Sequence, residues 1–352
     1  SLRRRPAPTH AGRPAGRADA RSGPAAEAGA PSRVTTRGGH MADTSLRSVT
    51  QPKRRRGPSE ETLSAWLAIS PWVIGFFIFT LGPLLASLYF SFTEYDVLSP
   101  PEWVGWKNYH ELLTDDRLFP KAIRNTIVYA VLYVPLHVMT ALAVALLLNE
   151  ARQMRGFFRT VFYLPSITPA VATAYLWIWI LNPNDGLVNQ ALRFLNLPAP
   201  AWTVDPFWTK PTIVISQLWH LGGAMIILLA GLKGVPPELY EAAKLDGANA
   251  WQRFRGVTVP MISGVLFFIA TISTIASLNI FTQGYVMFDA NGGPENSALF
   301  VVMYLFREGF RYLHMGYASA IAWILFLMIV TITIIQFRLS KRWVYYEAGT
   351  EA

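Results

Sequence analysis

The sequence predicts an all-α membrane protein with six transmembrane helices, and three observations support this prediction. Only 15% of the 352 residues are charged, against about 25% in an ordinary soluble domain. Hydrophobic residues make up 52% of the chain. Six runs of 22 residues or more contain no Asp, Glu, Lys or Arg: 62–93, 125–149, 160–184, 211–232, 256–288 and 312–337. A helix needs about 20 apolar residues to cross the hydrocarbon core, so each run is long enough.

The first element along the chain is a basic tail, residues 1–62. Its first 57 residues hold 13 Lys and Arg against three acids, and they carry the whole positive charge of the chain. The tail has too few large apolar residues to form a core, which predicts disorder. Met41 follows a stretch that resembles translated upstream sequence, so residues 1–40 are candidates for non-native sequence. Because the rest of the chain is close to neutral, a nucleic-acid partner is not expected.

The remaining elements form one membrane domain, residues 63–343, followed by a C-terminal tail, residues 344–352. The spans are expected at about 66–93, 125–149, 160–182, 211–232, 258–283 and 314–337. The connections at 150–159, 233–255 and 338–352 hold ten Lys and Arg in 48 residues, whereas the other three hold eight in 80. Cytoplasmic loops carry the excess of Lys and Arg. This pattern predicts that both termini are cytoplasmic and that the three less basic loops face outward.

The spans contain neutral polar groups and no Asp, Glu, Lys or Arg, and this pattern indicates a class of function. A proton- or sodium-driven carrier usually needs charged groups inside its spans. The neutral groups Gln217, Ser273, Ser277 and Asn279 favour a pathway for a neutral polar solute. The chain has no Cys, no phosphate-binding loop and no hydrolase motif, so neither catalysis nor a bound metal is expected. The energy for transport should therefore enter through another subunit.

The connection at 233–255 predicts a cytoplasmic helix–turn–helix. Pro236 and Pro237 suit a helix start, Gly247 suits a left-handed C-terminal cap, and Asn249 suits the N-cap of a second helix that ends near Phe254. This element presents several large apolar side chains: Leu239, Tyr240, Leu245, Trp251 and Phe254. Such a surface indicates either docking to a soluble partner or packing against the protein's own bundle. The pattern leaves both interpretations open.

Four segments resemble those of a known family. The stretch from Glu241 to Ala248, followed by Val259-Pro260, resembles the EAA loop of binding-protein-dependent ABC importer permeases. Further similar segments are Gly105–Tyr109, Arg155–Arg159 and Asn291–Pro294. Together they resemble the MalF/UgpA-like permeases of the carbohydrate-uptake branch over roughly residues 66–343. One departure is Gly264, where the family often has a second proline.

The resemblance implies a subunit that forms half of a translocation pathway for a mono- or oligosaccharide and works by alternating access. It implies a second homologous permease, two cytoplasmic ATPase subunits that bind ATP and Mg, and an extracytoplasmic solute-binding protein. The chain itself would bind no cofactor and would lie in the bilayer of a bacterial cytoplasmic membrane. Two alternatives are glycerol-3-phosphate or another small polyol derivative as cargo, and an ATP-independent secondary carrier.

The resemblance also assigns roles to residues. The ATPase subunit would dock on Glu241, Ala242, Ala243, Asp246 and Gly247. The solute would pass near Gln217, Ser273, Ser277 and Asn279, and the last outward loop, with Gly292, Gly293 and Pro294, would face the binding protein.

Overall fold

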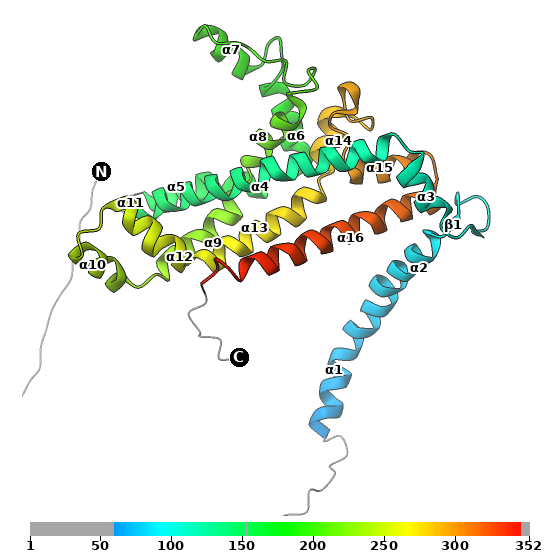
Figure 1. The fold of residues 1–352 in the computed structure, drawn as a ribbon, viewed down its shortest axis with the longest axis horizontal. Coiled ribbons are helices and arrows are strands. Elements are labelled where there is room, and N and C mark those ends of the chain that lie inside the picture. Colours follow the sequence, from blue (N-terminus) through cyan, green and yellow to red (C-terminus); the bar gives the residue numbers. More distant parts are fainter. Residues whose placement is uncertain (1–59, 152–153, 346–352) are drawn as a thin grey trace, which may run out of the picture. The chain divides into compact units, whose positions relative to one another are not determined.

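The computed structural model describes residues 60–151 and 154–345, which are almost entirely helical (Figure 1). Most of the predicted basic tail and residues 346–352 lie outside the described residues. The first half contains α1 (Glu60–Phe76), η1 (Phe77–Leu81), α2 (Gly82–Phe90), α3 (Lys107–Thr114), α4 (Leu118–Glu150), α5 (Arg155–Tyr163), η2 (Leu164–Ile167) and α6 (Ala170–Ile180). The middle contains α7 (Leu187–Phe194), α8 (Thr209–Leu218), α9 (Gly222–Lys233), α10 (Pro237–Leu245), α11 (Ala250–Arg253), η3 (Phe254–Thr258) and α12 (Val259–Met261). The last part contains α13 (Ser263–Leu278), α14 (Thr282–Phe288), η4 (Pro294–Asn296), α15 (Val301–Phe306), η5 (Arg307–Arg311) and α16 (Met315–Ser340).

Three helices are long and apolar enough to cross a membrane on their own: Thr62–Phe90, Leu118–Glu150 and Met315–Ser340. Three further helix pairs meet the same criteria jointly, but each pair is bent at a short break: Arg155–Ile167 with Ala170–Ile180, Thr209–Leu218 with Gly222–Lys233, and Ala250–Met261 with Ser263–Leu278. If each bent pair is one span, the described chain has six spans. This number agrees with the six charge-free runs of the sequence.

The breaks have local causes in the sequence. The first pair bends by 102° where η2 contains Pro165 and where Pro169 is the N-cap of α6. A proline lacks the N–H that would continue the helix. The second pair bends by 53° just before Gly222. A Cβ at Gly222 would lie 2.4 Å from the Ser166 hydroxyl, so the bare glycine lets α9 approach η2. The third pair bends by 68° at Ile262, whose ψ of 7° interrupts the helix.

The helix α4 is the centre of the packing. It lies along α9 and α13, and α16 packs on α13 (Figure 1). One apolar core surrounds the first half of α4, where Phe119 and Tyr129 are fully buried among residues of α15 and α16. A second core surrounds its last turns, where Ala145 and Leu148 pack against α9 and α13. The bundle is therefore organised by a single continuous helix, with the broken spans arranged around it.

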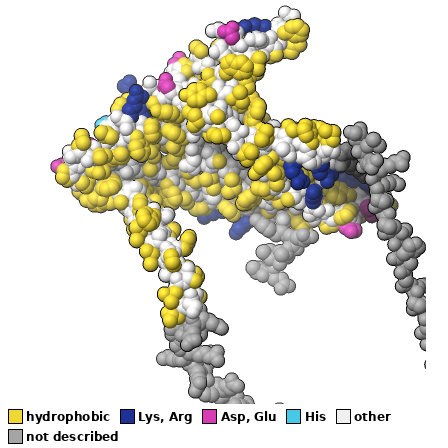
Figure 2. Space-filling model, turned by 180° about the vertical axis from the view of Figure 1, so that it is seen from behind, with side chains coloured by type: hydrophobic (Ala, Val, Ile, Leu, Met, Phe, Trp, Pro, Cys, Tyr) yellow, Lys and Arg dark blue, Asp and Glu magenta, His cyan; other side chains and the backbone are white. Residues whose placement is uncertain are grey.

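The surface of the described chain is predominantly apolar. Figure 2 shows hydrophobic side chains over most of the visible face, with charged groups gathered at a few places. In the run from Thr62 to Phe90, no residue of the most apolar 18-residue stretch is buried by the rest of the described chain. Trp66, Trp72 and Phe79 are between 65% and 79% exposed. Such a surface is stable in lipid, since most backbone polar groups of the run bond within its own helices, with Pro71 and Pro83 as the interruptions.

A short hairpin joins α2 to α3. Its strands, β1 (Thr93–Glu94) and β2 (Glu102–Trp103), are antiparallel, and Thr93 lies opposite Trp103. The buried side chain of Asn108 donates to the carbonyl oxygens of Ser91 and Thr93, at 3.0 and 2.9 Å. These bonds fix the hairpin to the first turn of α3.

The segment from Asp289 to Phe300 forms a compact loop held by α4. Asn125 Nδ2 donates to the carbonyl oxygens of Asn296 and Leu299, at 2.9 and 3.0 Å. Gly292 is buried and has φ +73°, and a Cβ there would lie 2.3 Å from the backbone nitrogen of Leu299. The loop can therefore close only if position 292 has no side chain.

We expect Gly292→Ala to destabilise the protein, because alanine would have to adopt a left-handed conformation and would also clash with Leu299. Strain of this kind costs roughly 1–3 kcal/mol before the clash is counted. The thermal unfolding midpoint of the purified protein in detergent should fall. The matched control is Gly223→Ala, where no atom lies within 4 Å of the added Cβ. Equal midpoints for the two variants would contradict the interpretation of this loop.

Candidate functional site

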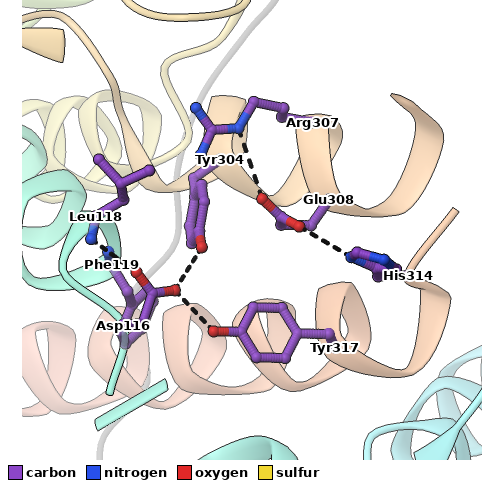
Figure 3. A network of polar contacts seen from close by, with 8 residues as sticks. All are labelled: Asp116, Leu118, Phe119, Tyr304, Arg307, Glu308, His314 and Tyr317. Carbon is purple, nitrogen blue, oxygen red and sulfur yellow. Dashed lines mark hydrogen bonds and ion pairs between the residues drawn. The ribbon is translucent and has the colours of Figure 1, made fainter. Parts of the chain in front are cut away.

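A carboxylate joins three helices at the end of the bundle where α4 begins (Figure 3). Asp116 Oδ1 accepts the backbone N–H groups of Leu118 and Phe119, at 2.7 and 3.0 Å, and so caps α4. Its Oδ2 accepts the hydroxyls of Tyr304 on α15 and Tyr317 on α16. A single side chain therefore fixes three segments that are up to 201 residues apart in the sequence.

A second set of polar contacts lies beside this carboxylate. Glu308 and Arg307 are both buried, and Arg307 Nε is 3.5 Å from the Glu308 carboxylate. His314 Nδ1 lies 3.2 Å from the other carboxylate oxygen of Glu308. The Arg307 guanidinium also lies over the ring of Tyr304, 4.8 Å from its centroid. We call Asp116, Tyr304, Arg307, Glu308, His314 and Tyr317 the Asp116 network.

The Asp116 network borders a cavity of about 1100 Å³ between the β1–β2 hairpin, α3 and the start of α16. Burial acts to raise the pKa of Asp116, but the two tyrosine hydroxyls and the backbone amides outweigh it, so this pKa lies below its ordinary value. A carboxylate bound by four donors is stabilised as an acceptor and is poorly suited to remove a proton. Among the described residues, no group of His, Asp and Glu could hold a metal ion. The network is therefore an anchor between helices.

A second candidate site lies where the span of α8 and α9 is broken. Trp177 on α6 and Trp219 after α8 meet edge to face, with ring centroids 5.5 Å apart. Trp177 Nε1 and Gln217 Oε1 are buried and have no hydrogen-bond partner in the described protein. His220 Nε2 lies 3.5 Å from the Thr173 hydroxyl. We call Trp177, Gln217, Trp219 and His220 the break cluster.

The break cluster offers a buried donor, Trp177 Nε1, a buried acceptor, Gln217 Oε1, and the rings of two tryptophans. The side chains of tryptophan and glutamine carry no formal charge. A buried polar atom without a partner costs about 1–3 kcal/mol, so such atoms indicate a site that is completed by a ligand or by water. Broken membrane helices recur at the solute sites of transporters, because the unwound backbone is tolerated only where it lines a cavity. The two unpartnered atoms are of a kind that a neutral polar molecule can complete.

The structure separates the four predicted pathway residues. Gln217 belongs to the break cluster. Ser273 and Ser277 share one buried face of α13, where Ser273 lies 3.0 Å from His137 Nδ1 and Ser277 donates to the carbonyl oxygen of Thr274 at 2.8 Å. Asn279 is exposed at the end of α13 and donates to the carbonyl oxygen of Ile275. In this conformation Ser273 contacts α4 and Ser277 bonds within α13, and of these four residues Gln217 alone has a buried side-chain atom without a hydrogen-bond partner.

The sequence pattern missed Trp177 and Trp219 in the break cluster, and it missed the whole Asp116 network. The partners of Asp116 lie 188 and 201 residues away, so no local pattern could pair them. One local signal existed: an acid two residues before Leu118, with Pro120 following, is typical of a helix start.

The third candidate site is the pair of short helices α10 and α11. As predicted, α10 begins at Pro237 and Gly247 is left-handed, with φ +79°. The N–H of Gly247 bonds to the carbonyl of Lys244, and that of Ala248 bonds to the carbonyl of Ala243, which is the Schellman pattern. Asn249 caps α11 in a reciprocal capping box with Gln252. The turn between the helices is therefore closed by bonds of its own.

Most of the residues that are predicted to dock an ATPase subunit are exposed. Glu241, Ala242, Asp246 and Gly247 are exposed and Ala243 is half-buried. Leu245 is 90% exposed and Trp251 is 66% exposed.

Two features of the element differ from a free docking helix pair. Tyr240 is half-buried, and its hydroxyl lies 3.0 Å from Thr258 Oγ1, so part of the element packs on the chain's own bundle. The second helix also does not end near Phe254, because it continues through η3 and α12 to Met261.

We expect Asp116→Asn to destabilise the folded protein by about 1.5–3 kcal/mol, since hydrogen bonds to a charged acceptor are replaced by bonds to a neutral amide. The measurement is the unfolding midpoint in detergent. Asp115→Asn is the matched control, because Asp115 is the exposed neighbour of Asp116.

The same pair of variants tests the protonation state of Asp116. Since its pKa in the folded state is lowered from 3.8, the stabilisation is complete above that value and is lost as the pH falls through the lower folded pKa. The difference between wild type and Asp116→Asn should therefore shrink on acidification. A difference that stays constant below this range would show that the negative charge is not responsible.

Known proteins resemble this chain over most of its length. The model of the family described as "Binding-protein-dependent transport system inner membrane component" matches residues 137–345. The probable ABC transporter permease protein YesP of Bacillus subtilis is 38% identical, covering 85% of this chain and 97% of that protein. The lactose transport system permease protein LacF of Rhizobium radiobacter is 33% identical, covering 79% of this chain and 94% of that protein.

The fold is also shared with a solved structure. A chain of the bacterial alginate ABC transporter, crystallised in complex with an alginate pentasaccharide-bound periplasmic protein, superposes with a TM-score of 0.69. It is 23% identical, and the match covers 80% of this chain and 95% of that chain. This likeness concerns the arrangement of the helices. With the family match over more than half of the sequence and the close relatives, the chain belongs to the binding-protein-dependent transport system inner membrane components and is an ABC transporter permease.

Proposed function

We propose that this permease forms half of the translocation pathway of an ATP-driven importer for a neutral carbohydrate. The observation that carries the proposal is the break cluster. A sugar ring has hydroxyl groups that can accept from Trp177 Nε1 and donate to Gln217 Oε1, the two buried atoms without partners. It also has an apolar face of C–H groups that can pack on an indole ring.

The relatives support a carbohydrate as cargo. Their names assign lactose to LacF, arabinooligosaccharides to AraP of Halalkalibacterium halodurans and starch degradation products to AmyD of Thermoanaerobacterium thermosulfurigenes. An anionic cargo, such as a polyol phosphate, would favour a cation at the site. The break cluster contains no Lys or Arg, and its one titratable member is His220, so a neutral mono- or oligosaccharide fits better.

The positions of the other two candidate sites support a transport function. Tyr240 on α10 packs in the same core as Leu148, at the end of α4, whereas the Asp116 network lies at its start (Figure 1). With 33 residues, α4 is about 50 Å long, which exceeds the roughly 30 Å of a hydrocarbon core. We infer that α10 and α11 lie on the cytoplasmic side, and that the loop at Gly292, Gly293 and Pro294 faces outward.

The proposed assembly contains a second permease, two ATPase subunits and an extracytoplasmic binding protein. We infer that an ATPase subunit docks on the exposed face formed by Glu241, Ala242, Asp246 and Gly247, with Leu245 and Trp251 beside it. ATP and Mg would bind to the ATPase subunits, and the permease would take no part in the chemistry of hydrolysis. The extracytoplasmic protein would meet the exposed residues Asn291 and Glu295 beside the buried Gly292.

The break cluster can be tested by uptake of radiolabelled sugars into proteoliposomes that contain the purified transporter and its binding protein. We expect Gln217→Leu and Trp219→Ala each to lower the rate of uptake about tenfold. This is the effect of losing one hydrogen bond or one ring contact to the sugar while the transporter changes between its inward- and outward-facing states. The protein should still assemble with its partners, because Gln217→Leu keeps the bulk of the side chain and removes one hydrogen bond, to Tyr129 of α4, besides the unpartnered Oε1.

The matched control for the break cluster is Trp179→Ala, which removes a 61% exposed indole from the same helix as Trp177. If Gln217→Leu and Trp219→Ala both transport like Trp179→Ala, the break cluster is not on the pathway. Uptake of a polyol phosphate in preference to every neutral sugar would instead support the alternative cargo.

The docking face can be tested at Gly247. We expect Gly247→Asp to insert normally into the membrane and to lose both uptake and co-purification of the ATPase subunits. The new side chain would strain a residue at φ +79° and would place a second negative charge beside Asp246. The measurement is mass spectrometry of the complex purified in mild detergent, together with uptake.

Gly156→Asp is the control for this substitution, because Gly156 has no atom within 4 Å of its Cβ position and no positive φ. It adds the same charge to a different exposed position. Normal uptake and a complete complex with Gly247→Asp would rule out docking at this turn.

A further inference from the structure

The chain that follows α16 turns back onto the start of α13. After Ser340, the backbone N–H groups of Trp343 and Val344 both donate to the Ser340 carbonyl, at 3.0 and 2.8 Å. This tight turn directs residues 343–345 across α13, where Val344 Cγ1 lies 4.0 Å from the position of a Cβ on Gly264. We call residues 343–345 the strap.

Two contacts fix the strap to α13. The backbone N–H of Tyr345 donates to the Ser263 hydroxyl at 2.8 Å. The ring of Trp343 meets that of Phe267 edge to face, with centroids 6.0 Å apart. The same phenylalanine packs against Phe337 of α16 at 5.0 Å, so one side chain of α13 contacts both the helix and the strap that follows it.

The strap binds at the bend between α12 and α13, which we call the hinge. Ser263 is 1% exposed, and its hydroxyl donates to the carbonyl of Pro260 at 2.6 Å while it accepts from Tyr345. Since Pro260 precedes the bend and Ser263 follows it, one hydroxyl connects both sides of the hinge to the strap.

The hinge is also connected to the docking helices. Tyr240 of α10 lies 3.0 Å from Thr258 Oγ1, two residues before Pro260. Farther along α13, Gln336 of α16 donates to the Thr274 hydroxyl at 2.8 Å. A continuous series of contacts therefore runs from α10 through the hinge to α13 and α16.

We propose that the strap is a positioning element that keeps the hinge from bending. When α10 and α11 are displaced, α13 and α16 then move with them. The proposal rests on the proposed function in one respect, the docking of an ATPase subunit on α10. Without the strap, the hinge would bend when α10 moves, and the movement would not reach the spans.

A matched pair of variants separates the hydrogen bond from the side chain. Tyr345→Pro removes the N–H that bonds to Ser263, whereas Tyr345→Ala keeps this N–H and removes a ring that is 55% exposed. A second pair compares deletion of residues 343–352 with deletion of residues 346–352. The first readout is the amount of solute taken up per ATP hydrolysed by the complete transporter in proteoliposomes.

We expect Tyr345→Pro and the longer deletion to lower this ratio at least about fivefold, the lower end of coupling between distant sites. The ATPase rate itself should remain. Tyr345→Ala and the shorter deletion should keep the wild-type ratio. If the ATPase rate and uptake fall in proportion, or if the ratio does not change, the strap has no positioning role and the proposal is overturned.

A second readout needs no transported solute, so it separates this proposal from the choice of cargo. The chain has no cysteine, so Lys244→Cys on α10 and Lys341→Cys after α16 can carry spin labels at two defined positions of this subunit. In the complete transporter, the distance between the labels should stay in one narrow population when ATP is added, because the strap makes α10 and α16 move together. The longer deletion should broaden this distribution, and an unchanged narrow distribution would overturn the proposal.

Discussion

The requirement that every backbone polar group in hydrocarbon has a partner governs this fold. The helix α4 meets it almost alone, since its 33 residues form one continuous helix in which Pro135 is the interior residue without an N–H. The broken spans meet it only because they pack around α4. At Gly222 the bare backbone approaches the end of α5 so closely that a Cβ would lie 2.8 Å from Tyr163 Cα. The breaks beside the break cluster are thus tolerated where other helices pack against them.

The parts of the structure that depend on local chemistry could be predicted from the sequence. Charge-free runs predict the spans, because a charged group in hydrocarbon is costly. Pro237, Gly247 and Asn249 predict the bounds of α10 and the start of α11, because caps and left-handed residues act over a few positions. The two bonds of the Schellman pattern lie within six residues, so the sequence contains nearly all of the information that shapes this turn.

Other parts depend on contacts between distant segments, and no local pattern contains them. Ser273 and Gln217 are both neutral polar residues of spans, and composition treats them alike. The structure distinguishes them because the Ser273 hydroxyl lies within hydrogen-bond distance of His137, whereas the buried Gln217 Oε1 has no hydrogen-bond partner. In the same way, Tyr304 and Tyr317 are unremarkable tyrosines until the fold brings both hydroxyls to Asp116. Burial and satisfaction of polar atoms, which separate function from packing here, are properties of the tertiary structure.

The self-contained turn between α10 and α11 has a consequence for how this surface evolves. A segment that already has its bound shape loses little conformational entropy on association. A small contact area is then enough for binding, and the fit between this element and a partner depends on the path of the backbone more than on any one exposed side chain. In the proposed docking, exposed positions such as Leu245 and Trp251 can vary together with the facing subunit, whereas Gly247 and Asn249 are constrained by the turn itself. Exchange of ATPase subunits between related permeases should therefore be limited by the geometry of this turn.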